Sequence, residues 1–140
     1  MSKIKLYEIL DKKELLTDLC SRIPYEVICS IYRIDDSCVG WRDSKLEGFI
    51  SNEIGFEFYF EDMVTVDNNL EKIKPYLREM SSMTKDERYE YNTLCIKNGH
   101  QNTIKSINWL LKNHFDINDL IPKGLAIKVT EENNPYNKED

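Results

Sequence analysis

Hydrophobic residues recur with two different periods along the chain, and the change of period predicts where helices give way to strands. Between Asp11 and Pro24 the apolar residues recur at the spacing of one helix face: Leu15, Leu16, Leu19, Cys20 and Ile23. Asp11 and Glu14 have the spacing of a capping box, and Pro24 ends the pattern because proline cannot continue a helix. We therefore expect an N-terminal helix that begins near Asp11 and ends before Pro24.

From Val27 onward the period is two, as on the faces of a strand. Strands are expected over residues 27–31, 38–41, 46–50, 56–60 and 63–66, with turns by composition at 35–37 and 51–52. In 56–60, three phenylalanines share one face, while Glu57, Tyr59 and Glu61 share the other. Residues 26–66 thus predict a small antiparallel sheet of four or five strands, either a curled sheet or an SH3-like half-barrel.

The second half of the chain is predicted to be a helical lobe. A short helical approach over 70–74 ends at Pro75, and Thr84 with Glu87 forms a capping box that opens a helix to Lys97. Arg78, between sheet and helix, is expected to pair with Glu87, Glu90 or a chain carbonyl. The next helix begins near 102–103 with an inner apolar stripe made of Ile104, Ile107, Leu111 and Phe115, widened by Trp109 and Leu110. The short loop between these helices favours an antiparallel hairpin.

Asp116 is expected to cap a single helical turn over 117–121, which Pro122 and Gly124 close. Residues 125–129 alternate as a final strand that docks on an edge of the sheet. The whole pattern predicts one α+β domain over 1–130, with a sheet lobe at about 24–67, a helical lobe at about 70–122 and a flexible tail over 131–140.

Composition is that of a folded globule, with 41% hydrophobic and 31% charged residues. The net charge of −6 lies entirely between Asp36 and Asp67, where eight acids face two bases. Such a segment repels phosphate, so nucleic acid is not expected to bind there. Two interpretations stay open: a surface for a basic partner protein, and a solvated face that keeps the protein soluble.

No apolar run approaches the length of a membrane span, and no secretory leader is evident, so we expect a cytoplasmic protein. The cysteines lack the spacing of zinc or redox motifs and are expected to be buried free thiols: Cys20, Cys29, Cys38 and Cys95. We expect no metal and no cofactor.

His114 and Asp116 are the residues with the most plausible spacing for acid–base chemistry. Asp116 has the local use of a cap, however, and no nucleophile elbow, H-E-x-x-H, P-loop or G-x-G-x-x-G motif accompanies the pair. We therefore expect no catalytic residues and assign His114 a structural role. The protein is predicted not to be an enzyme.

Aromatic residues among acids on the sheet indicate a partner-binding surface, formed by Trp41, Glu57, Tyr59, Glu61 and Asp62. The alternative is that the helical lobe covers this face. A second class of function is nucleic-acid modulation through the helical lobe, whose bases lie near Trp109: Lys105, Lys112, Lys123 and Lys128. A third is a minor enzyme or a structural virion component.

Three segments, 19–27, 73–87 and 109–127, resemble a family of small proteins from phages and prophages of Bacteroides-type gut bacteria. The second reads IKPYLREMSSMTKDE, and the third contains WLLKNHFD followed by LIPKGLAI. The chain departs from the family pattern at Glu79, Asn113 and 118–119. The resemblance implies a phage or prophage origin, a compact α+β fold and action in the host cell on host or phage components, and it implies no reaction. We expect an accessory protein that binds another protein, for example as an inhibitor of a host enzyme or defence component.

Overall fold

The N-terminal helix α1 (Lys3–Arg22) is longer than the sequence predicts. The computed structural model describes residues 3–34, 39–51, 55–61, 65–67, 70–97 and 104–136. The predicted start at Asp11 is wrong, because residues 3–10 contain neither proline nor glycine and the helix simply continues through them. The predicted end is confirmed: Pro24 lies in the 3-10 turn η1 (Ile23–Tyr25), and Glu26 leaves it in the left-handed conformation (φ 59°).

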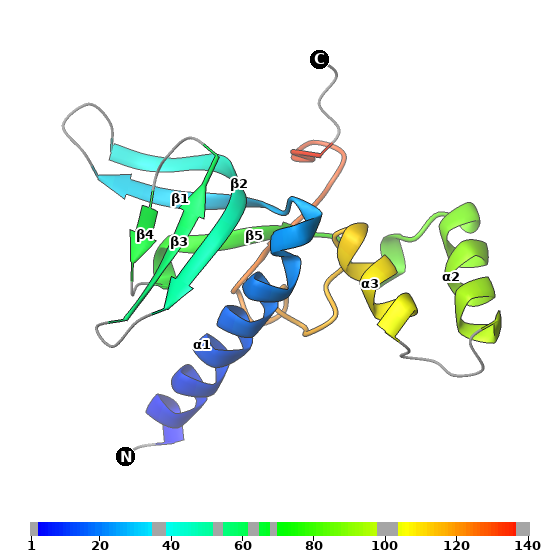
Figure 1. Cartoon of the computed structure of the whole chain (residues 1–140), viewed down its shortest axis with the longest axis horizontal. Helices are drawn as coiled ribbons and strands as arrows, with labels where there is room; N and C mark the ends of the chain where they lie inside the picture. Colours follow the sequence, from blue (N-terminus) through cyan, green and yellow to red (C-terminus); the bar gives the residue numbers. More distant parts are fainter. Residues whose placement is uncertain are drawn as a thin grey trace.

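The sheet has six strands in the linear order β4-β3-β2-β1-β5-β6. Its strands are β1 (Ile28–Ile34), β2 (Val39–Ser51), β3 (Phe56–Phe60), β4 (Thr65–Asp67), β5 (Ile73–Leu77) and β6 (Ile127–Lys128). The β5–β6 pair is parallel and the other four pairs are antiparallel. The α+β class is therefore confirmed, but the sheet is open, unlike the SH3-like alternative (Figure 1).

Strand β2 replaces two predicted strands with one. Its residues 39–45 pair with β1, and 46–51 pair with β3. The prediction of separate strands at 38–41 and 46–50 is wrong because 42–45, although they include Asp43 and Ser44, stay paired with β1. A register shift between Leu46 and Gly48 lies where β2 stops pairing with β1 and begins pairing with β3.

Pro75 lies inside β5, so the predicted helical approach over 70–74 is also wrong. The helical part is only the 3-10 turn η2 (Leu70–Lys72). The Leu77 carbonyl accepts a bond from the Val129 amide, so alternate residues of β5, Pro75 among them, direct their backbone groups toward the β6 side. Because β6 pairs only with Tyr76 and Leu77, Pro75 costs the sheet no ladder bond.

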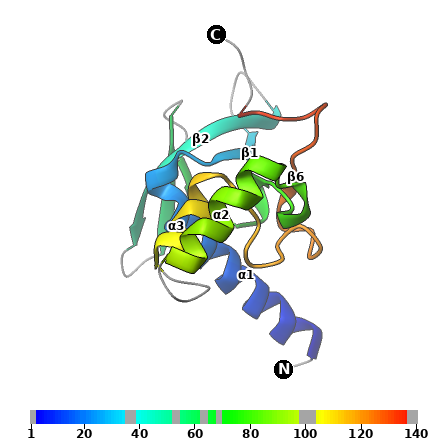
Figure 2. The same cartoon turned by 90° about the vertical axis from the view of Figure 1, so that its right-hand side faces the viewer.

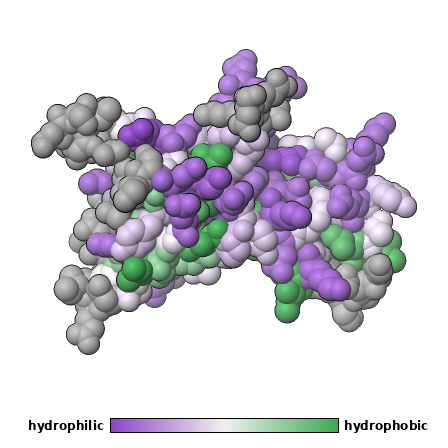
Figure 3. Space-filling view, turned by 45° about the horizontal axis from the view of Figure 1, so that its top comes forward, coloured by the Kyte–Doolittle hydropathy of each residue, from purple (hydrophilic) through white to green (hydrophobic). Residues whose placement is uncertain are grey.

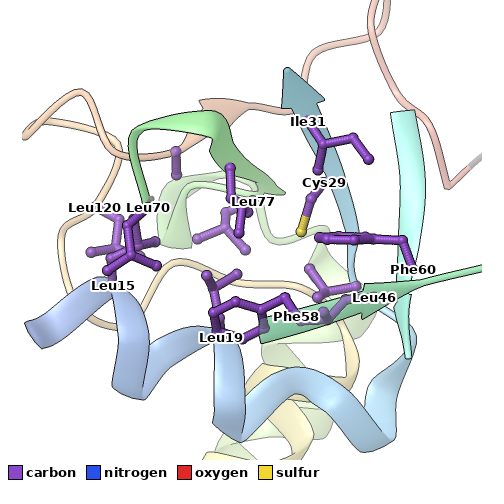
Figure 4. Close-up of a cluster of buried hydrophobic side chains, with 13 residues drawn as sticks. Leu15, Leu19, Cys29, Ile31, Leu46, Phe58, Phe60, Leu70, Leu77 and Leu120 are labelled. Atoms are coloured by element: carbon purple, nitrogen blue, oxygen red, sulfur yellow. The ribbon is translucent and has the colours of Figure 1, made fainter. Parts of the chain in front are cut away.

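The hydrophobic core lies between α1 and one face of the sheet, which we call the inner face (Figure 4). Leu15 and Leu19 of α1 face the sheet and are buried. The strands contribute the other side of this core: Cys29, Ile31, Leu46, Phe58, Phe60, Ile73 and Leu77. Each such side chain contributes roughly 1.5–3 kcal/mol when fully removed from water. Leu120 closes the core from the C-terminal segment.

The helical lobe consists of α2 (Lys85–Lys97) and α3 (Ile104–Lys112), which pack together beyond the end of β5 (Figures 1 and 2). The predicted capping box is confirmed: the Glu87 amide donates to Thr84 Oγ1 (3.1 Å), and the Thr84 amide donates to Glu87 Oε1 (3.0 Å). The expected helix end at Lys97 is confirmed, and the expected helix start at 102–103 lies outside the described residues. A 3-10 turn, η3 (Met80–Ser82), joins β5 to α2.

The inner stripe of α3 differs in part from its prediction. Leu110 and Leu111 are buried, but Ile104 is 78% exposed, so its assignment to the core is wrong. Ile104 is the first residue of α3, and the buried residues of the helix lie further along it: Ser106, Leu110 and Leu111. Asp116 does cap, but it closes a series of turns over 117–124 rather than a helical turn. The final strand β6 docks on β5 as expected, although it is shorter than 125–129.

Candidate partner-binding surface

The face of the sheet opposite α1, here called the outer face, carries an exposed aromatic pair. Tyr32 of β1 and Trp41 of β2 are directly opposed, with ring centroids 5.5 Å apart in an edge-on arrangement. Trp41 is 49% exposed and Val39, two residues away on the same face, is 70% exposed. The Lys74 ammonium lies 5.9 Å from the centre of the Trp41 ring, a cation–π distance. The pair is therefore ordered on one side and open to solvent on the other.

Polar groups border this aromatic pair. The Tyr76 hydroxyl donates to Asp43 Oδ1 at 2.8 Å. Partial burial and this bond raise the pKa of Tyr76 to about 12, so the phenol stays protonated at neutral pH. Lys74 and Asp43 both lie opposite Ser30 in the sheet, on its two sides. The border thus carries both signs of charge.

A second part of the outer face is formed by β3. Tyr59 donates its hydroxyl to Glu57 Oε2 at 2.8 Å, and that bond is the main cause of a raised Tyr59 pKa. The Tyr59 ring lies across from Gly48, where an added Cβ would sit 3.9 Å from it. The missing side chain at Gly48 therefore leaves the strand surface bare beside the ring. Glu61 is exposed at the end of the same strand face.

The structure places the predicted surface residues in two groups. Glu57, Tyr59 and Glu61 lie together on β3, whereas Trp41 lies beside Tyr32. The partner of Tyr59 in β2 is Gly48, seven residues from Trp41, which corresponds to a separation of roughly 20 Å along the strand. Asp62 lies outside the described residues. The outer-face residues that the sequence analysis missed, Tyr32, Val39, Asp43, Lys74 and Tyr76, are recognisable only once the register is known.

None of the described helices covers Trp41. Helix α1 crosses the inner face, and α2 with α3 lies beyond β5 (Figures 1 and 2). Figure 3 shows hydrophobic side chains at separate places, over the sheet and over the helical lobe, with hydrophilic side chains between them. On the lobe the exposed apolar side chains include Tyr89, Ile96 and Ile104.

A buried ion pair within α1 makes hydrogen bonds to the C-terminal segment. Arg22 and Asp18 have fully buried side chains, and Arg22 Nε donates to Asp18 Oδ2 at 2.7 Å. Arg22 Nη2 also donates to the Phe115 carbonyl (2.7 Å), and the Asn118 amide donates to Asp18 Oδ1 (2.9 Å). Bonds of this kind offset the cost of burying both charges, so the arrangement is a structural joint.

His114 and Asp116 do not form a catalytic pair in the described residues. The Asp116 carboxylate accepts from the amides of Leu120 (3.0 Å) and Ile121 (2.9 Å). The His114 ring instead stacks on Tyr136, with centroids 3.7 Å apart and planes 9° from parallel. Its burial, followed by the charges of Arg22 and Arg78, lowers the pKa of His114 to about 4. His114 is therefore neutral at pH 7.

Arg78 has the structural partner that the sequence predicts. Its Nη1 and Nη2 donate to the two carboxylate oxygens of Glu87 at 2.7 and 2.6 Å, and its guanidinium lies 4.3 Å from the centre of the Phe115 ring. The hydrogen bonds from Arg78 are the main reason that the pKa of Glu87 is lowered to about 2. The backbone of Arg78 bonds on both sides to the segment that follows α3, through His114 and Asp116.

In the part of the chain that the structure describes, no three His, Cys, Asp or Glu side chains form a group suited to a metal ion. Cys29 and Cys95 are buried free thiols and Cys20 is partly buried, while Cys38 lies outside the described residues. No described helix is both long and apolar enough to cross a membrane.

Fold and surface together define an α+β protein with an open, mostly antiparallel sheet and an exposed aromatic pair on its outer face. Comparison of the chain with protein-family models, with curated proteins and with solved structures gives no match. The function is therefore inferred from the geometry of the surface itself.

Proposed function

We propose that the protein is a non-catalytic binding module that docks another protein on the outer face of its sheet. The observation that carries the proposal is the half-exposed Trp41, held by Tyr32 and Lys74 on a face that no described helix covers. Tryptophan and tyrosine contribute more binding free energy at protein interfaces than most residues. Since Trp41 is already held on one side, its ring loses little freedom when a partner covers the other side.

The border of the surface favours a partner of mixed but mainly basic charge. Asp43, Glu57 and Glu61 are acidic, while Lys74 and Lys45 are the bases on the same face. Charged borders around an aromatic centre raise the rate of association and reject partners of the wrong charge. The resemblance to phage and prophage proteins makes a host or phage protein the expected partner, with inhibition of a host enzyme or defence component as one form of action.

The test is affinity purification of the tagged chain from a Bacteroides-type host lysate, followed by mass spectrometry at low and moderate salt. Trp41→Ala should deplete one dominant co-purifying protein by about tenfold or more, which is the loss typical of a central aromatic residue. The matched control is Ile96→Ala, which removes an apolar side chain that is 80% exposed on the helical lobe. Equal recovery of the same protein with both variants, or loss only with Ile96→Ala, would contradict the proposal.

Nucleic-acid modulation through the helical lobe has less support from the contacts. The Trp109 ring stacks against Phe115 (5.8 Å) and packs on Tyr91 (5.6 Å), so it already has two aromatic neighbours within the lobe. Lys123 pairs with Glu14, and Lys128 lies 3.7 Å from Glu79. A gel-shift series in which affinity falls steeply with salt would nevertheless favour this function over protein binding.

A further inference from the structure

A polar cavity lies where the segment after α3 meets the end of the described chain. It has a volume of about 300 Å³ and is lined by Arg78, Lys112, Asn113, His114, Asn134 and Tyr136. A second cavity, of about 600 Å³, shares Arg78 and Asn134 with the first and extends along residues 129–131. Volumes of this size are in the range of small-molecule sites. The outer-face proposal makes no use of these cavities.

The backbone of His114 shows that this side chain is placed at a cost. His114 adopts the left-handed conformation (φ 65°), its amide bonds to the Leu111 carbonyl (3.0 Å), and the Phe115 amide bonds to the Leu110 carbonyl (2.9 Å). This is the Schellman arrangement that ends a helix, and glycine is the residue that adopts it most easily.

The chain contains the same arrangement a second time, with the expected residue. The Gly124 amide bonds to the Ile121 carbonyl (3.0 Å), the Leu125 amide bonds to the Leu120 carbonyl (2.9 Å), and Gly124 has φ 75°. The backbone geometry at 114 would thus accept glycine. Glu26 (φ 59°) and Asp119 (φ 55°) adopt this conformation too, so the angle alone assigns no function. What histidine adds over glycine at 114 is a ring that stacks on Tyr136 and lines the cavity.

The ring of His114 lines a cavity whose charge is positive. The lining of the smaller cavity contains Arg78 and Lys112 and no carboxylate. Glu87 neutralises Arg78, but no described carboxylate lies within ion-pair distance of Lys112. Nδ1 of His114 is buried and lacks a hydrogen-bond partner among the described residues. The cavity lining therefore combines a lysine that no described carboxylate pairs with and several amide and ring groups, while the unsatisfied Nδ1 belongs to a lining residue but is itself buried.

We propose that this cavity binds a small molecule through its carboxylate or phosphate group, with Lys112 as the ion-pair partner of the oxyanion. Arg78 adds no net charge to the cavity, because its Nη1 and Nη2 are already paired with the Glu87 carboxylate. The adjoining larger cavity, whose lining includes the acidic residue Glu131, has room for the rest of the molecule. Carboxylates and phosphates share the chemistry that this lining recognises, namely a compact anion with several acceptor oxygens.

Nuclear magnetic resonance of the isotopically labelled full chain can test this, because the chain has only two histidines, His100 and His114. The probes are inorganic phosphate and acetate, each added at pH 7 with chloride keeping the ionic strength constant. We expect saturable shifts of the His114 ring signals, with a Kd of roughly 1 mM or tighter, and no saturable shift at His100. Lys112→Gln should weaken this binding by about tenfold.

The matched control is Lys105→Gln, which removes the same charge from an exposed position on the same helix and should leave binding unchanged. Saturation by phosphate alone would identify the ligand as a phosphate ester, and saturation by acetate alone would identify it as a carboxylic acid. Shifts that stay linear with both probes, or saturation that Lys112→Gln leaves unaltered, would overturn the proposal. Trp41→Ala should not affect this binding, so the cavity and the outer face are tested separately.

Discussion

Replacing Tyr136 with phenylalanine should weaken the joint between β1 and β5. The Tyr136 hydroxyl accepts from the Ile28 amide (3.0 Å) and donates to the Tyr76 carbonyl (2.7 Å). The pairing of β1 with β5 ends at Cys29 and Pro75, so Ile28 and Tyr76 are the next opposed residues. The hydroxyl therefore lies where their direct ladder bond would form, and it connects two strands that diverge beyond it.

The magnitude follows from what the substitution leaves behind. Two hydrogen bonds of about 1 kcal/mol each are lost, and the Ile28 amide and Tyr76 carbonyl keep their need for a partner at a partly buried position. Desolvation of an unsatisfied group costs a further 1–3 kcal/mol or so, although water entering the gap can reduce this. We expect the free energy of unfolding to fall by about 2–4 kcal/mol, a large share of the stability of a domain.

Urea unfolding followed by tryptophan fluorescence measures this change. Tyr89→Phe is the control, because Tyr89 is 76% exposed and its loss of a hydroxyl should change stability by less than about 0.5 kcal/mol. Amide hydrogen exchange adds a local measurement, since the Ile28 amide should exchange faster in Tyr136→Phe. A decrease below about 0.5 kcal/mol for Tyr136→Phe, or equal decreases for both variants, would refute the bridging role.

Three further predictions test other contacts. Because the pKa of His114 is lowered to about 4, the unfolded chain takes up this proton first as pH falls from 6.5. The free energy of unfolding should therefore drop by up to roughly 3 kcal/mol as the pH falls from 6.5 to about 4. In His114→Asn, the urea midpoint should change less over the same pH range. Asp18→Ala should cost about 3–5 kcal/mol in urea unfolding because Arg22 is left buried and uncompensated, and Asp18→Leu with Arg22→Met should restore most of it. Thr84→Ala should lower the melting temperature through a loss of about 1 kcal/mol, since the Glu87 amide loses its cap.

The sequence predicts the elements of this fold better than their boundaries. Alternation along 56–60 and the capping box at Thr84 and Glu87 are local signals, and both are confirmed. The errors arise where a tertiary contact, rather than the local sequence, determines the secondary structure. By local rules, Pro75 should end a helix. In β5, however, the proline lacks its backbone N–H at a position that β6 does not pair with, so it can lie within the strand. Likewise, 42–45 contain nothing that demands a strand, and pairing with β1 makes them one.

The contacts of the C-terminal segment and the cavity beside His114 could not be predicted from sequence patterns. Polar residues around Pro135 predict a flexible tail from Glu131, whereas the structure buries Pro135 and sets Tyr136 against β1, β5 and His114. A single aromatic residue in a polar segment carries no periodicity, so its contact with residues about a hundred positions away gives no local signal. The strain at His114 is equally invisible, because only the backbone angle distinguishes it from an ordinary helix end.

The continuity of β2 bears directly on how the outer face can work. The register shift between Leu46 and Gly48 separates the aromatic pair at Trp41 from the acidic group around Tyr59, by roughly 20 Å along the strand. A protein interface of ordinary size covers about 800 Å² on each partner, a patch about 30 Å across. One partner can therefore contact both groups, with Trp41 as its apolar anchor and Glu57 and Glu61 as the acidic border. A small ligand cannot span that distance, so the two proposals, a protein partner on the outer face and a small anion in the cavity beside His114, concern separate parts of the molecule.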